Sequence, residues 1–370
     1  TWFFQVMPIF FIVGGYSNAV SLESAKRKGI GYAGWLAARL HRLVSPLLLL
    51  LVAWAATAFA MKLVDTRPAV VQFTSQAALI PTWFLAIYTM LVLLAPVVYK
   101  FWRRFGLASF FFFAAMAAIT DGAFFAADMR WMGWTNYFWV WLAVQQLGFA
   151  WRDGRIGGVG ARLAISAVGL ITLYLLIRSG PYPLAMVGSP DKLLSNTLPP
   201  KITLLALGLF QFGLLMAFEV PMRRALQSLR LWTATVLINS MIMTIYLWHI
   251  TVMVIIGSVL YLSGGFGFGL EPGTSAWWMT RPIWIGVLLV FLLPVALLLS
   301  PLERRSRPAD ARSPAAASQI VGAFMICLGI SLLAMWGFGG GPRPWLDVTA
   351  FGLVVVGSVI SGVLSRQTFR

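Results

Sequence analysis

The chain has 370 residues, of which 60% are hydrophobic and only 11% are charged. Soluble domains carry about 25% charged residues, so this composition excludes an ordinary soluble or disordered protein. The formal net charge is +17, but the basic residues lie between apolar runs, which argues against nucleic-acid binding. Cys327 is the single cysteine, so the sequence has no disulfide framework and no Cys/His metal motif.

Eleven apolar stretches are long enough to cross a bilayer as helices. In chain order they cover residues 2–20, 43–61, 82–98, 106–120, 134–151, 163–177, 202–218, 236–262, 282–300, 319–337 and 348–364. The predicted fold is therefore an all-α, polytopic bundle of transmembrane helices. Because the chain starts at Thr1 and enters an apolar run at once, we expect one more helix upstream.

The lysines and arginines are distributed unevenly between alternate loops. One set of loops holds twenty of the 28 and the other set holds eight. Cytoplasmic loops carry the excess of Lys and Arg, so the richer set and the C-terminus are predicted to be cytoplasmic. Residues 303–318 form a basic linker rich in Pro, Ala and Ser, which separates a predicted core (1–302) from two additional transmembrane helices (319–370).

Arg39 and Arg42 lie three residues apart, so they share one helix face at the predicted cytoplasmic boundary. Guanidinium groups at this spacing suit a phosphate or pyrophosphate. Arginines beside a membrane also serve only to set topology, and the spacing leaves both roles open. His41, between the two arginines, is predicted to be an exposed interfacial residue.

Three polar residues of the apolar stretch 236–262 indicate a second candidate site. Asn239, Tyr246 and His249 fall within about 80° on one face at 100° per residue. Intramembrane polar groups are costly, so this face is expected to lie toward the protein interior. A neutral histidine there can be a base, a donor or only a structural hydrogen-bond partner.

On the opposite, predicted outer side, Asp121 and Asp128 precede Trp131. Carboxylates beside aromatic rings suit the hydroxyls and ring faces of sugars, although tryptophans also populate the ordinary interfacial belt. These residues are candidates for contact with an acceptor molecule.

Four stretches, taken in order, resemble the integral-membrane acyltransferase 3 family, particularly its actinobacterial branch. They are Phe-Phe-Ile-Val-Gly-Gly-Tyr at 10–16, the Arg39/Arg42 pair followed by Leu43 and Pro46, Trp-Phe-Leu-Ala-Ile-Tyr at 83–88, and Tyr-Leu-Trp-His at 246–249. The family carries an arginine and its catalytic histidine in the first core helix. The resemblance therefore places the primary histidine upstream of Thr1.

The resemblance implies transfer of a short acyl group, usually acetyl, from cytoplasmic acyl-CoA to a hydroxyl of a cell-envelope glycolipid or polysaccharide precursor. A trehalose mycolate is the specific acceptor it suggests, and the bacterial plasma membrane is the expected location. By this resemblance Arg39 and Arg42 bind acyl-CoA. The orienting candidates are His249, Tyr246 and Asn239, and the acceptor-binding candidates are Asp121, Asp128, Trp131 and Trp83. The expected partners are the bilayer, acyl-CoA, the acceptor and a lipid exporter, with no bound cofactor, metal or nucleic acid.

Two other function classes fit part of the sequence. A transporter or exporter component shares the polar intramembrane residues and the outer loops, but it gives no reason for an arginine pair matched to phosphates. The chain also lacks intramembrane carboxylates suited to ion coupling. A catalytically inactive scaffold for envelope-lipid assembly is the third class.

Overall fold

The computed structural model describes residues 2–188, 194–265, 268–271, 273–303, 313–339 and 345–364. The chain divides into two compact units, and each is described by itself. Unit 1 comprises Thr1–Gly31 and Leu91–Leu231, and unit 2 comprises Tyr32–Met90 and Trp232–Arg370. The greater part of the predicted linker, 304–312, lies outside the described residues.

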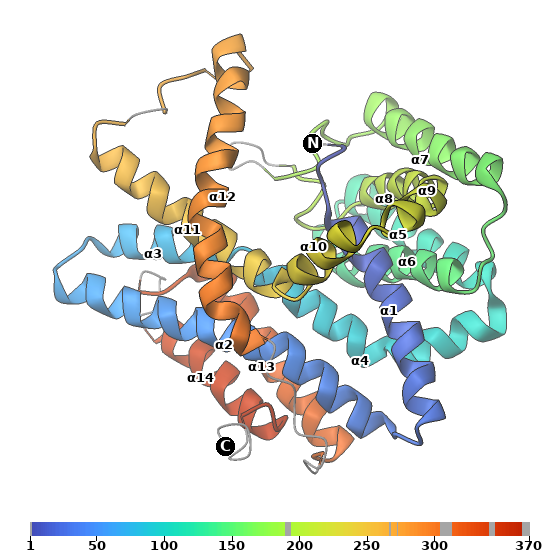
Figure 1. The fold of residues 1–370 in the computed structure, drawn as a ribbon, viewed down its shortest axis with the longest axis horizontal. Coiled ribbons are helices and arrows are strands. Elements are labelled where there is room, and N and C mark those ends of the chain that lie inside the picture. The colour runs from blue at the N-terminus through green and yellow to red at the C-terminus, as the bar shows by residue number, and fades with distance from the viewer. Residues whose placement is uncertain are drawn as a thin grey trace. The chain divides into compact units, whose positions relative to one another are not determined.

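The regular elements of the described residues are helices (Figure 1). Those of unit 1 are α1 (Met7–Arg27), α5 (Leu107–Ala126), the 3-10 helix η1 (Arg130–Thr135), α6 (Asn136–Arg152), α7 (Val159–Ser179), α8 (Ile202–Ala217) and α9 (Glu219–Ala225). Those of unit 2 are α2 (Tyr32–Leu63), α3 (Pro68–Leu79), α11 (Ile242–Leu262), α12 (Ser275–Glu303), α13 (Ala316–Trp336) and α14 (Leu346–Ile360). Two helices, α4 (Thr82–Phe105) and α10 (Leu229–Asn239), contain residues of both units.

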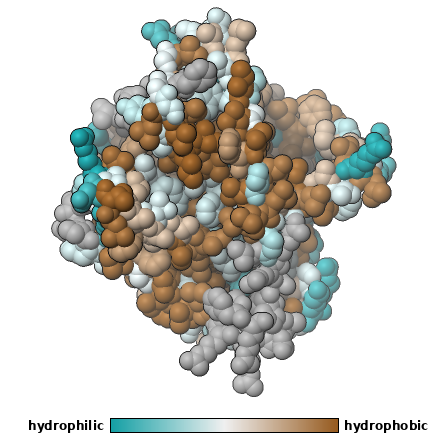
Figure 2. Space-filling model, turned by 60° about the vertical axis from the view of Figure 1, so that its left-hand side comes forward, coloured by the Kyte–Doolittle hydropathy of each residue, from teal (hydrophilic) through white to brown (hydrophobic). Residues whose placement is uncertain are grey.

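Seven of the described helices are long and apolar enough to cross a membrane: α2, α4, α5, α7, α11, α12 and α13. The pair α8 and α9, bent by 51°, makes an eighth if it forms one span. The protein is therefore an all-α, polytopic membrane protein with seven or eight candidate spans. Much of the face drawn in Figure 2 is apolar, with hydrophilic residues toward its edges, as a bilayer requires.

The other predicted spans also coincide with helices. The stretches 2–20, 134–151 and 348–364 correspond to α1, α6 and α14. With 17 and 15 residues, α6 and α14 are shorter than the roughly 20 residues of a typical span. Their helical structure is confirmed, and a total of eleven spans stays a prediction.

The prediction of one continuous helix over 236–262 is wrong. Helix α10 ends at Asn239 and α11 begins at Ile242, with Met241 outside helical geometry at φ −120° and ψ 6°. The Ser240 hydroxyl donates to the Leu237 carbonyl at 2.7 Å. Because the backbone of Met241 leaves helical geometry, the break separates Asn239 from the helix of Tyr246 and His249.

Within unit 1, glycines allow the helix backbones to approach closely. A Cβ atom added to Gly148 of α6 would lie 2.1 Å from the Ile12 carbonyl oxygen of α1. A Cβ atom on Gly15 of α1 would lie 2.2 Å from the Gln145 carbonyl oxygen of α6. Close packing of this kind replaces the hydrophobic driving force that is missing between helices in lipid. Helices α7 and α8, side by side in Figure 1, are similarly close at Gly169 and Gly213.

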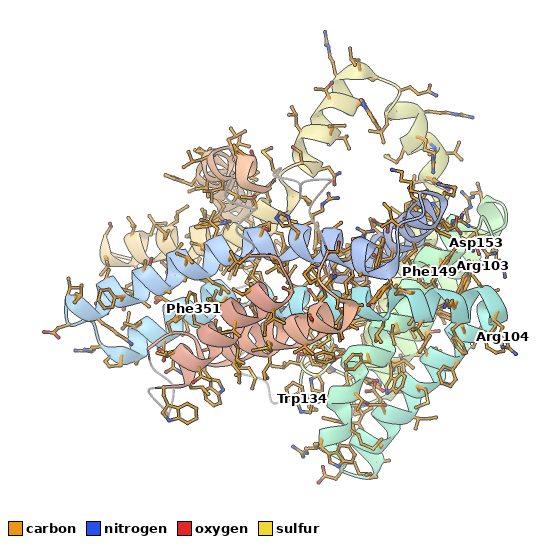
Figure 3. The ribbon with its side chains drawn as sticks, turned by 90° about the horizontal axis from the view of Figure 1, so that it is seen from below. Arg103, Arg104, Trp134, Phe149, Asp153 and Phe351 are labelled. Atoms are coloured by element: carbon orange, nitrogen blue, oxygen red, sulfur yellow. The ribbon has the colours of Figure 1, made fainter. Side chains whose placement is uncertain are left out.

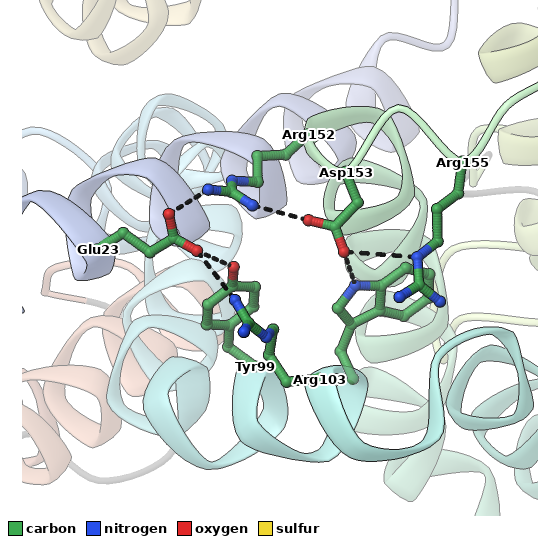
Figure 4. A network of polar contacts seen from close by, with 7 residues as sticks. Glu23, Tyr99, Arg103, Arg152, Asp153 and Arg155 are labelled. Carbon is green, nitrogen blue, oxygen red and sulfur yellow. Dashed lines mark hydrogen bonds and ion pairs between the residues drawn. The ribbon is translucent and has the colours of Figure 1, made fainter.

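One end of unit 1 is held by a network of charged residues (Figure 4). Glu23, at the end of α1, accepts hydrogen bonds from Tyr99 at 2.5 Å and from Arg152. Arg152 also pairs with Asp153 at 2.9 Å, and Trp102 Nε1 donates to Asp153 at 2.9 Å. Figure 3 shows Arg103, Phe149 and Asp153 gathered at this end.

The charged network joins the ends of helices that the loop charges predict to lie on the same side of the membrane. Its members come from the ends of α1, α4 and α6, which all belong to the arginine-rich set of loops. The alternation of the helices within unit 1 therefore agrees with the prediction. The assignment of this side to the cytoplasm stays a prediction.

The close contact of α1 with α6 generates the first testable prediction. Replacing Gly148 by Ala forces the two backbones apart, because the new methyl group meets backbone atoms that have no space to move. We expect a loss of about 1–3 kcal/mol, typical of overpacking, measured as a lower apparent melting temperature in detergent.

The matched control is Gly122→Ala in α5, because a Cβ atom at Gly122 has no neighbour within 4 Å. This variant is expected to melt at or above the wild-type temperature, since alanine favours helix over glycine. Equal melting temperatures of the two variants would contradict the close-packing explanation.

Candidate functional site

The arginine pair lies near the start of α2 in unit 2. Arg39 is half-buried with its guanidinium carbon 5.8 Å above the Trp35 ring, and Arg42 is exposed. Tyr88 of α4 interacts electrostatically with both arginines. The structure therefore groups two cations and one phenol, a set of donors suited to an anionic ligand.

Tyr88 is a site residue that the sequence motifs did not predict, although the sequence contains a signal for it. Tyr88 ends the stretch 83–88 quoted for the family resemblance, and its hydroxyl is a polar group within an apolar part of the sequence. A hydroxyl in such a position is expected to find a partner inside the protein. Only the structure shows that Tyr88 lies within electrostatic reach of both Arg39 and Arg42.

The prediction that His41 is exposed is wrong. His41 is only 5% exposed. It comes four residues after Ala37 and three before Val44, which are both buried. Residues at these spacings form one stripe of a helix, so His41 lies on the packed face while Arg42 lies on the exposed one.

Tyr246 and His249 share a second polar position, on α11 in unit 2. The Tyr246 hydroxyl donates to the Pro81 carbonyl oxygen at 2.9 Å, and its ring packs edge-on against Phe84 at 5.2 Å. Trp83 in turn packs edge-on against Phe84 at 6.4 Å. The structure thus brings the predicted residues Trp83, Tyr246 and His249 to one region of unit 2.

The backbone of α11 determines which nitrogen of His249 carries the proton. His249 Nδ1 lies 2.5 Å from the Tyr246 carbonyl oxygen. A carbonyl oxygen only accepts, so Nδ1 must carry the hydrogen. In the neutral imidazole, Nε2 is then the nitrogen with the free lone pair, ready to accept a hydrogen bond from a hydroxyl group.

The third orienting candidate, Asn239, does not join this group through α11. It is the last residue of α10 and is exposed. The helix break after Asn239 removes the shared face that placed it with Tyr246 and His249.

The arginine pair and His249 lie at different levels of α2. Trp54 of α2 donates to the Thr251 hydroxyl of α11 at 3.0 Å, so the His249 region is level with Trp54. Trp54 follows Arg42 by twelve residues, which corresponds to about 18 Å along a helix. A ligand that contacts both places must therefore be long, with its anionic groups at one end.

Asp121, a predicted acceptor contact, is buried in unit 1 and already has protein partners. Its side chain is 2% exposed and accepts hydrogen bonds from Asn136 at 2.8 Å, Tyr182 at 3.1 Å and the backbone N–H of Ile202 at 2.8 Å. These bonds join α5, α6 and the start of α8. The arrangement gives Asp121 a structural role in this conformation.

Asp128 and Trp131 differ from Asp121 in their exposure. Asp128 pairs with Arg130 at 2.9 Å, and both side chains are exposed. Trp131 is 67% exposed. Both are accessible at the surface of unit 1, and their contact with an acceptor stays a prediction.

Lys201 is the cationic partner of Asp121. Its Nζ atom lies 3.9 Å from the Asp121 carboxylate and 3.2 Å from the centre of the Phe124 ring. Its side chain is almost fully buried. Burial lowers the pKa of Lys201 from 10.5 to about 8, although the negative charge of Asp121 opposes this shift.

The lowered pKa of Lys201 makes the stability of the protein depend on pH. Between pH 8 and 10.5 the unfolded chain holds a proton on Lys201 that the folded chain has released. The contribution of Lys201 to the free energy of unfolding therefore rises with pH in this window. We expect the melting temperature of the wild type, relative to Lys201→Met, to increase from pH 7.5 to pH 10.

Lys100→Met serves as the control for this titration, because Lys100 is an exposed lysine. Its melting temperature relative to the wild type should stay constant over the same range. A difference between the wild type and Lys201→Met that does not change with pH would disprove the shifted pKa.

The comparisons with known proteins identify the family. An acyltransferase domain model, that of the acyltransferase 3 family, matches residues 1–301. No curated protein and no solved structure matches the chain. Since the matched region includes α1 to α11 and nearly all of α12, the chain belongs to the acyltransferase 3 family of integral-membrane proteins, and this membership implies that it is an acyltransferase.

Proposed function

We propose that the protein is an O-acyltransferase that moves a short acyl group, acetyl, from acyl-CoA to a hydroxyl of a cell-envelope glycolipid or polysaccharide precursor. The observation that carries this proposal is the grouping of Arg39, Arg42 and Tyr88 in the acyltransferase domain. An acyl donor that carries several phosphate groups is a suitable ligand for these three side chains. A transporter that carries out no acyl transfer does not need a phosphate-bearing ligand at this grouping, and neither does an inactive scaffold.

The donor binds with its phosphates at the arginine pair. Guanidinium groups form paired hydrogen bonds with phosphate oxygens, and Arg42 is exposed to receive them. The excess of lysine and arginine in one set of loops attracts an anionic donor to that side. We place this side, together with the C-terminus, in the bacterial cytoplasm, and we count eleven crossings of the plasma membrane.

The acceptor hydroxyl binds beside His249. The lone pair on Nε2 accepts the hydrogen bond of the hydroxyl group, and Trp83 belongs to the stretch that contacts Tyr246 through Pro81 and Phe84. The hydroxyl oxygen attacks the carbonyl carbon of the thioester, the carbon–sulfur bond breaks, and the CoA thiolate leaves and is protonated. The hydroxyl proton passes to a base, and His249 and Tyr246 orient the reacting groups. Asp128 and Trp131 are the exposed acceptor candidates, and a trehalose mycolate is the specific acceptor to test.

The length of the donor agrees with the separation of the two positions. CoA carries its phosphates at one end and its thioester at the other end of a flexible arm. The arginine pair and the level of His249 are separated by about 18 Å along α2. One extended donor molecule therefore reaches from the arginines toward the hydroxyl held at His249.

The first functional prediction concerns donor binding. Removing both guanidinium groups with Arg39→Ala/Arg42→Ala should raise the KM for acetyl-CoA about tenfold or more per arginine, because hydrogen bonds to charged groups contribute about 1.5–3 kcal/mol each. The measurement is acceptor-dependent release of free CoA by the intact protein in lipid, with an envelope glycolipid extract as the acceptor.

Arg27→Ala/Lys28→Ala is the matched control, since these two exposed basic residues lie on the same predicted side. Its kinetics should equal those of the wild type. If the wild type neither releases CoA nor binds acetyl-CoA, the acetyl-CoA donor is excluded and transport of a lipid becomes the function to test.

The second functional prediction concerns His249. Asparagine at this position retains a donor near the Tyr246 carbonyl oxygen but removes the Nε2 acceptor. We expect His249→Asn to lower kcat by up to about 100-fold through loss of orientation, with the KM for acetyl-CoA unchanged. A raised donor KM with an unchanged kcat would instead place His249 in donor binding.

A further inference from the structure

Helices α13 and α14 follow the residues that the family model matches. In unit 2 they form a close pair, seen side by side in Figure 1. A Cβ atom on Gly322 would lie 2.5 Å from the Gly357 carbonyl oxygen, and one on Gly329 would lie 2.5 Å from that of Ala350. The two helices therefore behave as one packed element.

This pair contacts α2 close to the arginines. Gln319, near the start of α13, is fully buried, and its Nε2 atom donates to the Ala33 carbonyl oxygen at 2.9 Å. Ala33 lies six residues before Arg39, less than two helical turns away. The hydrogen bond therefore ties the beginning of the arginine-bearing helix to α13.

The same face of α13 contacts α4 close to Tyr88. Cys327 is 4% exposed, and its Sγ atom donates to the Ala86 carbonyl oxygen at 3.5 Å. Ala86 lies two residues before Tyr88. Gln319 and Cys327 are eight residues apart, so they lie within about 80° on one face of the helix.

At its other end the pair is joined to α3. Gln76 Nε2 donates to the Met335 carbonyl oxygen at 2.7 Å, and the backbone N–H of Phe338 donates to the Ser75 hydroxyl at 2.8 Å. These bonds anchor α13 along its whole length. A helix held at both ends has little freedom to shift relative to α2 and α4.

We propose that α13 positions the donor-binding residues Arg39, Arg42 and Tyr88, with Gln319 as the principal positioning residue. The inference rests on the proposed function of the arginine pair. It makes the C-terminal helices of this chain a working part of the donor site, although they lie beyond the matched acyltransferase domain. A shift of α13 then changes the affinity for the donor more than the rate of acyl transfer.

The test compares Gln319→Met with Val321→Ala in the intact protein in lipid. Methionine has nearly the length and volume of glutamine but no N–H group, and Val321 is an exposed residue of the same helix. We expect Gln319→Met to raise the KM for acetyl-CoA about fivefold to tenfold, with kcat within twofold of the wild type. Hydrogen exchange of residues 32–42 should be faster in Gln319→Met and unchanged in Val321→Ala.

A second variant, Cys327→Ala, removes only the Sγ atom and tests the other contact without a large change in volume. It should raise the donor KM and speed the exchange of residues 82–90. Unchanged donor KM and unchanged exchange in both variants would overturn the proposal. So would a lower kcat and melting temperature without a change in donor KM, because that result is the signature of a purely structural role.

The exchange measurement separates this inference from the proposed function. If the wild type uses no acyl-CoA but Gln319→Met still speeds the exchange of residues 32–42, the identity of the donor is wrong and the positioning by α13 holds. If the wild type uses acyl-CoA but Gln319→Met and Cys327→Ala change neither the donor KM nor the hydrogen exchange, acyl-CoA is the donor and α13 does not position the donor-binding residues.

Discussion

A polar group inside an apolar bundle is costly unless it finds a partner within the protein, and this constraint accounts for the main polar contacts of both units. Glu23 is surrounded by donors at one end of unit 1, and Asp121 is surrounded by donors elsewhere in that unit. Between such places the helices pack through glycines and apolar side chains. In unit 2 the same constraint fixes Tyr246 to a carbonyl oxygen and Trp54 to a hydroxyl. Side chains that hold the helices together also fix the residues available for chemistry.

The sequence predicted the features that depend on composition along the chain. Apolar length located the helices, and the alternation of basic loops agrees with the charged network that joins α1, α4 and α6. It did not predict the break between α10 and α11, because hydropathy measures how apolar a stretch is and carries no information on the backbone angles of one residue such as Met241. It also missed the burial of His41 and the partner of Tyr88, since both depend on which neighbouring helix covers a given face. Contacts between helices distant in sequence have no local signal.

Within unit 2 the acyltransferase family and the geometry lead to one arrangement. The structure groups Arg39 and Arg42 with Tyr88, and it brings Tyr246 of α11 to the stretch that contains Trp83. In the proposed function the first group binds the anionic donor and the second orients the acceptor. Helix α2 connects the two places, and α13 supports α2 near its start. The proposed function therefore assigns donor binding and acceptor orientation to separate residues of unit 2.

The hydrogen bond of His249 to its own helix has a consequence for chemical reagents. With the Nδ1 hydrogen directed at the Tyr246 carbonyl oxygen, the ring orientation belongs to α11 itself and needs no second helix. An electrophile that reaches this side chain can attach only to Nε2. We therefore expect a covalent reagent that reaches this histidine to form the Nε2 adduct.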